Sequence, residues 1–154
     1  MPFSLPVPTH VITGTLGSGK TTAITQLIAS KPAAETWAVL VNEFGAVGID
    51  EALLETSSAP LGGGVAVKQL AGGCLCCALS GVTSVAIAQL VRQVRPSRLL
   101  IEPSGLGHPA ALLDILRGEH LQTALAVQPL VCLVRPGWPA GHLPGIHALI
   151  PFLP

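Results

Sequence analysis

The stretch "GTLGSGKT", residues 14–21, determines how the rest of the sequence is interpreted. It matches the pattern G-x-x-x-x-G-K-[ST], in which glycines let backbone N–H groups wrap closely around phosphate oxygens. Within this pattern, Lys20 would reach the β- and γ-phosphates of a nucleotide and the Thr21 hydroxyl would ligate Mg²⁺. A plain glycine turn is the alternative, but the strand expected before the motif and the helix expected after it favour a phosphate-binding loop (P-loop).

Short aliphatic runs alternate with helical patterns between residues 10 and 134, and this alternation predicts the fold class. The expected strands are 10–13, 37–42, 65–70, 98–102 and 129–134, and the expected helices are 21–30, 80–95 and 109–117. Pro96 would end the second helix, and Pro109 would begin the third. We therefore predict an α/β fold of the P-loop NTPase type, with a mainly parallel sheet flanked by helices.

Charge and hydropathy narrow the classes of partner. The 154 residues include eight basic and eight acidic side chains, so the chain has no net charge and lacks the basic surface that nucleic acids and anionic membranes attract. No run reaches the roughly 18 uninterrupted apolar residues of a membrane span, and the first ten residues lack the basic flank of a targeting segment. We expect a cytoplasmic protein without nucleic-acid or membrane partners, whose cysteines are thiols.

Acidic residues follow two of the expected strands. Glu102 ends the strand 98–102, while Glu43 and Asp50 follow the strand 37–42. In open α/β sheets ligands bind at the carboxyl ends of the strands, where a carboxylate can hold Mg²⁺ directly or through water. Beside a P-loop, Glu102 is a magnesium candidate rather than a surface cap. Glu43 and Asp50 are candidates for contacting Mg²⁺, water or a second metal, with a solvated glycine-rich connector as the alternative.

A cluster of thiols points to metal chemistry. Three of the four cysteines lie within "GGCLCC", residues 72–77: Cys74, Cys76 and Cys77. Thiolates suit Zn²⁺, but neighbouring cysteines do not easily offer every sulfur to one tetrahedral ion, so two or three would bind and water, His or a carboxylate would complete the shell. A redox role and inert buried thiols are the alternatives. His108 and His120 are candidate nitrogen ligands, although a lone histidine of this kind is more often structural.

Four segments together resemble one family, the CobW-like P-loop GTPases of the SIMIBI class, which includes nitrile-hydratase activators and zinc metallochaperones. The segments are "GTLGSGKTT" (14–22), "VNEFGAVGID" (41–50), "GGCLCC" (72–77) and "IEPSGLGHP" (101–109). They stand in the order of the family and at about its separations. The resemblance covers roughly residues 10–134.

The resemblance implies roles for residues that match the motifs of the family. Its nucleotide-binding residues fall on Gly14, Gly17, Ser18, Gly19, Lys20, Thr21 and Thr22. Its E-x-x-G switch motif falls on Glu102, and the resemblance implies that this residue senses Mg²⁺ and the γ-phosphate. Lys20 and Glu102 are then the implied catalytic residues. Its C-x-C-C motif places a site for Zn²⁺ or a related ion on Cys74, Cys76 and Cys77.

The implied activity is that of a metallochaperone that binds and hydrolyses GTP with Mg²⁺ and passes zinc to a metal-requiring client. A dimer that forms depending on the bound nucleotide is a candidate assembly of the protein. A truncated, non-hydrolysing metal-binding or interaction module is the alternative from another class. A small-molecule kinase would leave the C-x-C-C motif unexplained.

The sequence also departs from the family in several places. Ala46 stands where many members carry an acidic residue, and the asparagine-lysine-x-aspartate motif that recognises guanine is absent, so we expect little discrimination between GTP and ATP. Arg135 stands where members usually place Asp. We divide the chain into a partial P-loop GTPase domain, 1–134, whose sheet is incomplete at its C-terminal end, and an atypical proline-rich apolar tail, 135–154. A frameshift or truncation would produce such a tail, and a hydrophobic segment that docks on a partner is the alternative.

Overall fold

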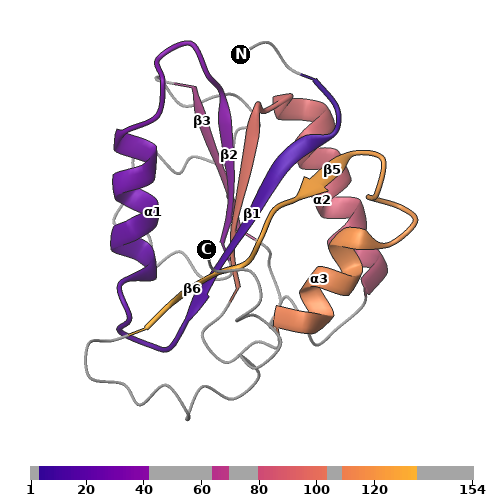
Figure 1. Cartoon of the computed structure of the whole chain (residues 1–154). Coiled ribbons are helices and arrows are strands. Elements are labelled where there is room, and N and C mark those ends of the chain that lie inside the picture. Colours follow the sequence, from indigo (N-terminus) through magenta and orange to yellow (C-terminus); the bar gives the residue numbers. More distant parts are fainter. Residues whose placement is uncertain (1–3, 42–63, 70–79, 104–108, 135–154) are drawn as a thin grey trace.

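The computed structural model of the chain describes residues 4–41, 64–69, 80–103 and 109–134. In these ranges six strands form one sheet, and all of its pairings are parallel. The strands are β1 (Val7–Gly14), β2 (Trp37–Val41), β3 (Val65–Gln69), β4 (Arg98–Glu102), β5 (Leu125–Val127) and β6 (Val131–Leu133). Their order is β3-β2-β4-β1-β5, with β6 paired to the second half of β1. The predicted α/β fold with a mainly parallel sheet is therefore confirmed (Figure 1).

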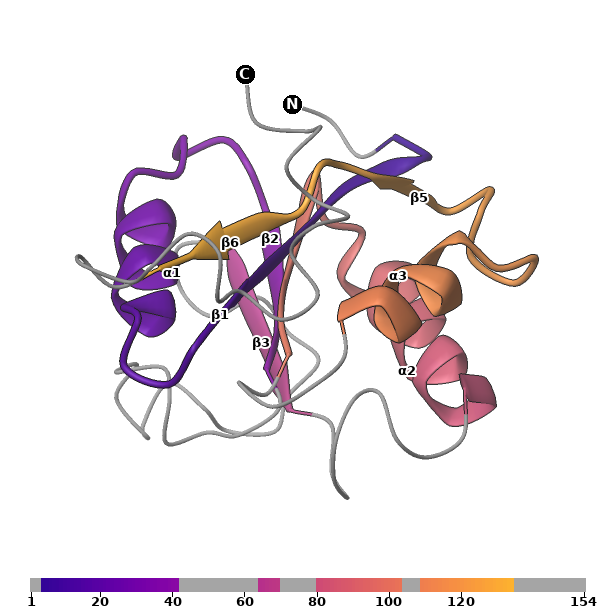
Figure 2. The ribbon, with the colours of Figure 1, turned by 60° about the horizontal axis from the view of Figure 1, so that its bottom comes forward.

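Three helices within the described ranges cover the two faces of this sheet. They are α1 (Lys20–Ala29), α2 (Ser80–Val94) and α3 (Pro109–Arg117). α1 lies on one side of the sheet, and α2 and α3 lie together on the other side (Figures 1 and 2). Because the strands are parallel, each connecting helix begins at the edge where strands end and runs back to the edge where they begin. We call these the carboxyl edge and the amino edge of the sheet.

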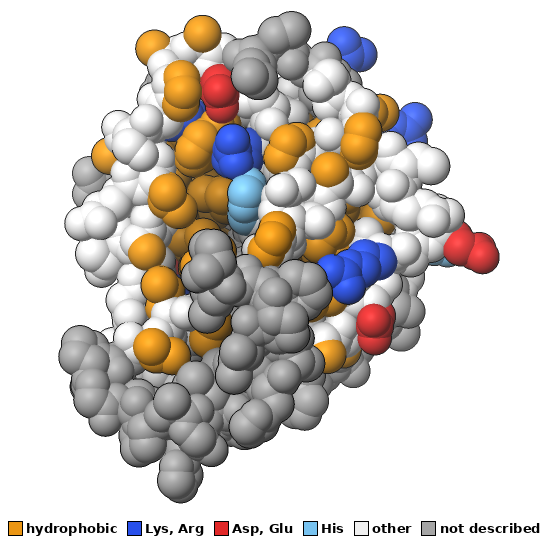
Figure 3. All heavy atoms as spheres, in the orientation of Figure 1, with side chains coloured by type: hydrophobic (Ala, Val, Ile, Leu, Met, Phe, Trp, Pro, Cys, Tyr) orange, Lys and Arg blue, Asp and Glu red, His pale blue; other side chains and the backbone are white. Residues whose placement is uncertain are grey.

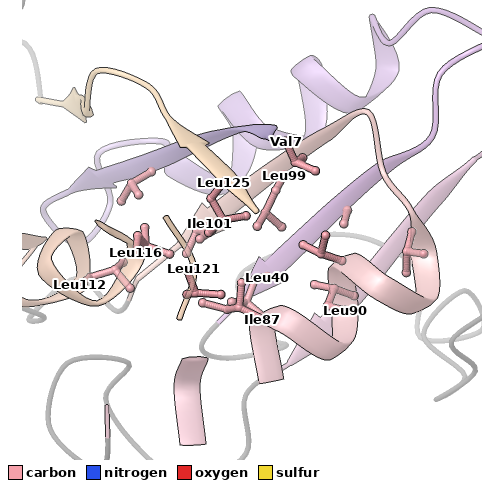
Figure 4. Packing of buried hydrophobic residues seen from close by; sticks show 14 of the residues in the cluster. Val7, Leu40, Ile87, Leu90, Leu99, Ile101, Leu112, Leu116, Leu121 and Leu125 are labelled. Carbon is pink, nitrogen blue, oxygen red and sulfur yellow. The ribbon is translucent and has the colours of Figure 1, made fainter. Parts of the chain in front are cut away.

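Hydrophobic side chains fill the space on both sides of the sheet. Leu99 and Ile101 of β4 pack with Leu116 of α3 in the larger core, which lies toward α2 and α3 (Figure 4). On the other face, Leu100 of β4 belongs to a smaller core with Ile24 of α1. Burying one such side chain fully stabilises the fold by about 1.5–3 kcal/mol. All five residues of β2 are buried, as expected of a strand that is covered on both faces.

Most elements agree with the sequence prediction, and two of them match it in both bounds. β4 occupies 98–102 and α3 occupies 109–117, as expected. α2 ends at Val94, two residues before Pro96, which cannot continue a helix. β1 is longer than the predicted strand 10–13, because the chain continues in register with its neighbours from Val7.

The sequence did not reveal β5, and it placed β6 too early. β5 has only three residues, which is too short to show a hydrophobic period. Pro129 has no N–H group and separates the two strands, so the predicted strand 129–134 is found only at Val131–Leu133. The N–H of Gln128 still donates to the Thr9 carbonyl (2.9 Å), which keeps this segment against β1 across the break.

Among the described residues, no helix is long and apolar enough to cross a bilayer. The longest of them, α2, has 15 residues. At a rise of about 1.5 Å per residue it would span about 22 Å, less than the hydrocarbon core of about 30 Å.

The packing of α1 can be tested with two substitutions on the same helix. Ile24 is fully buried against the sheet, whereas Leu27 is 41% exposed. Ile24→Ala should lower the free energy of unfolding by about 2–5 kcal/mol, because it leaves a cavity in the smaller core. Leu27→Ala should change it by no more than about 0.5 kcal/mol. Urea titration followed by circular dichroism measures both, and equal losses would contradict this packing.

Candidate functional site

The predicted P-loop lies at the carboxyl edge of the sheet, between the end of β1 and the start of α1. Its three glycines have positive φ angles, a region that glycine adopts without strain: Gly14 (151°), Gly17 (73°) and Gly19 (91°). A Cβ atom at Gly14 would also collide with the carbonyl oxygen of Leu133 in β6 and with Ser18 Oγ. The path of this loop therefore depends on its glycines.

Lys20 is the first residue of α1, and its side chain folds back over the loop. Its Nζ donates hydrogen bonds to the carbonyl oxygens of Gly14 and Thr15, each at 3.0 Å. The residue is only 8% exposed. An ammonium group is thus held inside the loop by two backbone acceptors, at the place where the motif predicts a contact with phosphate.

Glu102 ends β4 at the same edge. It pairs in register with Val41 of β2, and β4 also pairs with β1, so the carboxylate stands one strand away from the P-loop. Glu102 is 5% exposed, and burial raises the pKa of its carboxyl group, while the nearby charge of Lys20 acts in the opposite direction. The structure therefore brings Lys20 and Glu102, which are far apart in sequence, into one electrostatic environment.

Several oxygen atoms around the loop are buried without a hydrogen-bond partner in the described part of the chain. They are Thr15 Oγ1, Ser18 Oγ and Glu102 Oε2. Buried polar atoms normally have partners, so unpaired oxygens gathered at one edge make this edge a candidate binding site for a polar ligand or ion. A hydroxyl from Thr21 and a carboxylate from Glu102 form an oxygen donor set of the kind that Mg²⁺ prefers. The residues present thus fit Mg²⁺.

The other predicted residues of the loop lie where α1 begins. Thr21 is partly buried and Thr22 is exposed, both in the first turn. No acidic residue occupies this turn, and Gly19, the N-cap residue, offers no side chain to bond its N–H groups. Anions are favoured at such a helix start, because its N–H groups point outward and the helix dipole is positive there.

Two residues near the loop were missed by sequence reasoning. Thr15 occupies a variable position of the motif, and its role as an acceptor for Lys20 is a backbone property that no side-chain pattern reveals. Cys132 of β6 pairs with Thr13 at the end of β1, and its thiol interacts electrostatically with the charge of Lys20. Burial raises the pKa of this thiol, and the charge of Lys20 lowers it to a smaller extent. The thiol falls outside the cysteine motif, so nothing in the sequence linked it to the loop.

Several predicted site residues lie outside the described residues. They are Glu43, Asp50, Cys74, Cys76, Cys77 and His108. His120 is described and exposed. It lies beyond the end of α3 and shortly before Ala124, whose carbonyl accepts the N–H of Val7 at the amino end of β1. The structure therefore does not bring His120 to the carboxyl edge.

Comparison with known proteins identifies a family for the chain. Residues 8–137 match the sequence model described as CobW/HypB/UreG, nucleotide-binding domain. The matched range contains the P-loop, Glu102 and the three clustered cysteines. No solved structure matches the chain.

Curated relatives agree with this match. The chain is 48% identical to the zinc chaperone YeiR of Escherichia coli over 128 residues, which are 83% of this chain and 37% of that protein. It is 31% identical to the zinc chaperone CobW of a Sinorhizobium species, covering 83% of this chain and 36% of the relative. It is also 31% identical to the zinc-regulated GTPase metalloprotein activator 1 of Saccharomyces cerevisiae, covering 83% and 30% respectively. The chain thus spans about a third of the length of these relatives, and it belongs to the CobW/HypB/UreG family of nucleotide-binding proteins.

Proposed function

We propose that this chain binds GTP with Mg²⁺ at the P-loop, hydrolyses it, and uses the change of nucleotide state to control the binding and transfer of zinc to a client protein. The observation that carries this proposal is the buried Lys20 ammonium, which is held by two loop carbonyls one strand away from Glu102. The names of relatives, zinc chaperone and zinc-regulated GTPase metalloprotein activator, support the pairing of zinc with GTP.

Lys20 would act by exchanging its partners. Without nucleotide its charge is shared between the carbonyl groups of Gly14 and Thr15. Phosphate oxygens carry more negative charge than carbonyl oxygens, so β- and γ-phosphates would draw Nζ toward them. There the ammonium group would offset the charge that develops on the γ-phosphate during transfer to water.

Glu102 would act as the sensor on the neighbouring strand. Its unpartnered Oε2 can accept a hydrogen bond from a water molecule at the γ-phosphate. Thr21 and Glu102, directly or through water, would hold Mg²⁺, which would neutralise phosphate charge. Because Lys20 influences the charge state of Glu102, a phosphate that captures Lys20 also changes the electrostatic environment of Glu102. Glu43 would join this group, since it follows Val41, the register partner of Glu102, by two residues.

Zinc would be bound on the same edge of the sheet. Cys74 follows Gln69, the last residue of β3, by five residues. The ends of β3 and β1 are about 14 Å apart, because three strand spacings of about 4.8 Å separate them. Cys74, Cys76 and Cys77 would hold the ion as thiolates in a reducing compartment such as the cytoplasm. Short distances along one edge would let the state of the nucleotide alter the geometry of the thiols.

A metal-binding module without hydrolysis is the second candidate. It is favoured by the lack of an asparagine-lysine-x-aspartate motif in these 154 residues. A single-turnover assay with protein in excess over γ-labelled GTP distinguishes the two. Release of phosphate that requires Mg²⁺ supports hydrolysis. Binding of GTP without release over hours would reject hydrolysis and leave the second candidate.

Lys20→Ala should abolish Mg²⁺-dependent nucleotide binding, because no other described cation lies inside the loop. Arg117→Ala is the matched control, since it removes one positive charge from an exposed site at the far end of α3. Titration of a fluorescent GTP analogue should show saturable binding for the parent and the control only. Unchanged affinity in Lys20→Ala would show that the nucleotide binds elsewhere.

Zinc content should depend on the clustered cysteines and not on the fourth cysteine. The parent should retain about one Zn²⁺ per chain after desalting, and a variant with Ser at positions 74, 76 and 77 should lose it. Cys132→Ser, which changes a thiol on β6, should keep it. Elemental analysis of the three proteins measures this directly. Equal zinc in the triple variant and the parent would place the metal on other ligands.

A further inference from the structure

A second group of polar side chains lies near the amino edge of the sheet, away from the P-loop. His10 of β1 contacts Arg98 of β4 across the paired strands, and Nη1 of Arg98 donates to Nε2 of His10. The guanidinium group of Arg98 also lies 5.2 Å from the centre of the Trp37 ring, on β2. A single arginine thus connects three neighbouring strands. On the face shown in Figure 3, a histidine lies beside a Lys or Arg side chain.

The chemistry of this contact fixes the protonation state of His10. An arginine side chain has only donors, so Nε2 of His10 can take part only as an acceptor. The imidazole must therefore be neutral, with its proton on Nδ1. A proton added at Nε2 would remove the acceptor and place two cations in contact.

Few other charged groups face this pair in the described residues. Glu35, in the segment before β2, accepts a hydrogen bond from Trp37 Nε1 (2.6 Å) and from Ser97 Oγ (3.4 Å). Lys31 is bonded to the backbone carbonyl of Glu35 (2.6 Å). The hydrogen bond from Trp37 is the main cause that lowers the pKa of Glu35, so this carboxylate stays ionised near neutral pH. On α1 the only charged residue is Lys20, which belongs to the opposite edge, and β5 and β6 carry no charged residue.

We propose that His10 and Arg98 form a pH-sensitive lock, which joins β1 to β4 while His10 is neutral and opens when His10 takes up a proton. β1 leads into the P-loop and β4 ends at Glu102, so the lock joins the two strands that position the candidate site. It does not depend on nucleotide or zinc. Acidification would therefore loosen the β1–β4 pair.

The effect of pH on stability follows from the difference between the pKa of His10 in the folded chain and in the unfolded chain. Burial first, and the charge of Arg98 second, lower the pKa of His10 below 6.5 in the folded protein. As the pH falls below about 6.5, the unfolded chain gains a proton at this residue that the folded chain does not accept. The unfolding equilibrium constant should then rise by up to about tenfold per pH unit from this group alone. Above pH 6.5 the contribution of the neutral lock is complete.

A direct test is an NMR titration of the histidine C–H signals in the full chain, with His10 assigned by its loss in His10→Gln. The pKa of His10 should lie below 6.5. Arg98→Met removes the charge and the donor but keeps an apolar stem near Trp37, so it should move the pKa of His10 upward. A pKa of 6.5 or higher for His10 in the parent would overturn the proposal.

Stability measurements provide a second test with a matched control. His10→Gln keeps an acceptor for Arg98 that does not titrate, whereas His120→Gln removes an exposed histidine. Between pH 7.5 and pH 5.5, urea unfolding of the parent and of His120→Gln should show a larger rise in the unfolding constant than that of His10→Gln. Identical pH dependence in all three proteins would overturn the lock. If His10→Gln does not fold, the titration of the parent and of Arg98→Met decides alone.

Discussion

The parallel pairing of β1 with β4 is the contact on which the rest of this structure depends. Thr9, His10 and Val11 stand in register with Leu99, Leu100 and Ile101. Because the strands run in the same direction, the P-loop after β1 and Glu102 at the end of β4 must emerge at one edge. Residues of both strands take part in the cores on the two faces, so the packing that stabilises the domain also sets the spacing of the candidate site.

Core and site differ in how well their groups are satisfied. The core consists of aliphatic side chains and Trp37, almost wholly buried, each contributing favourable transfer free energy. At the carboxyl edge, Lys20 relies on backbone carbonyls of its own loop, and buried oxygens of Thr15, Ser18 and Glu102 lack partners among the described residues. Unpaired buried polar groups cost free energy, which the packed sheet offsets. A ligand with phosphate oxygens and a metal ion would satisfy these groups, and this is the physical reason for assigning a function to this edge.

Sequence patterns were informative where a strong local rule applied. The G-x-x-x-x-G-K-[ST] motif located the loop, and prolines located the end of α2 and the start of α3. β5 was not predicted, because three residues show no hydrophobic period and its pairing depends on tertiary contact with β1. The contacts of Cys132 and of the His10–Arg98 pair were not predicted for a related reason, since they join strands that are distant in sequence. The predicted ligands Glu43, Cys74, Cys76 and Cys77 remain predictions.

When nucleotide binds, residues 14–21 should wrap its phosphates while β4 responds at the same edge of the sheet. Hydrogen–deuterium exchange of the full chain, with and without Mg²⁺ and a non-hydrolysable GTP analogue, tests it most directly. With nucleotide bound, we expect slower exchange of the backbone amides of Gly17 to Thr22 and of the end of β4 around Glu102, with little change at α3. Unchanged exchange in the P-loop at saturating nucleotide, or protection confined to other segments, would contradict it.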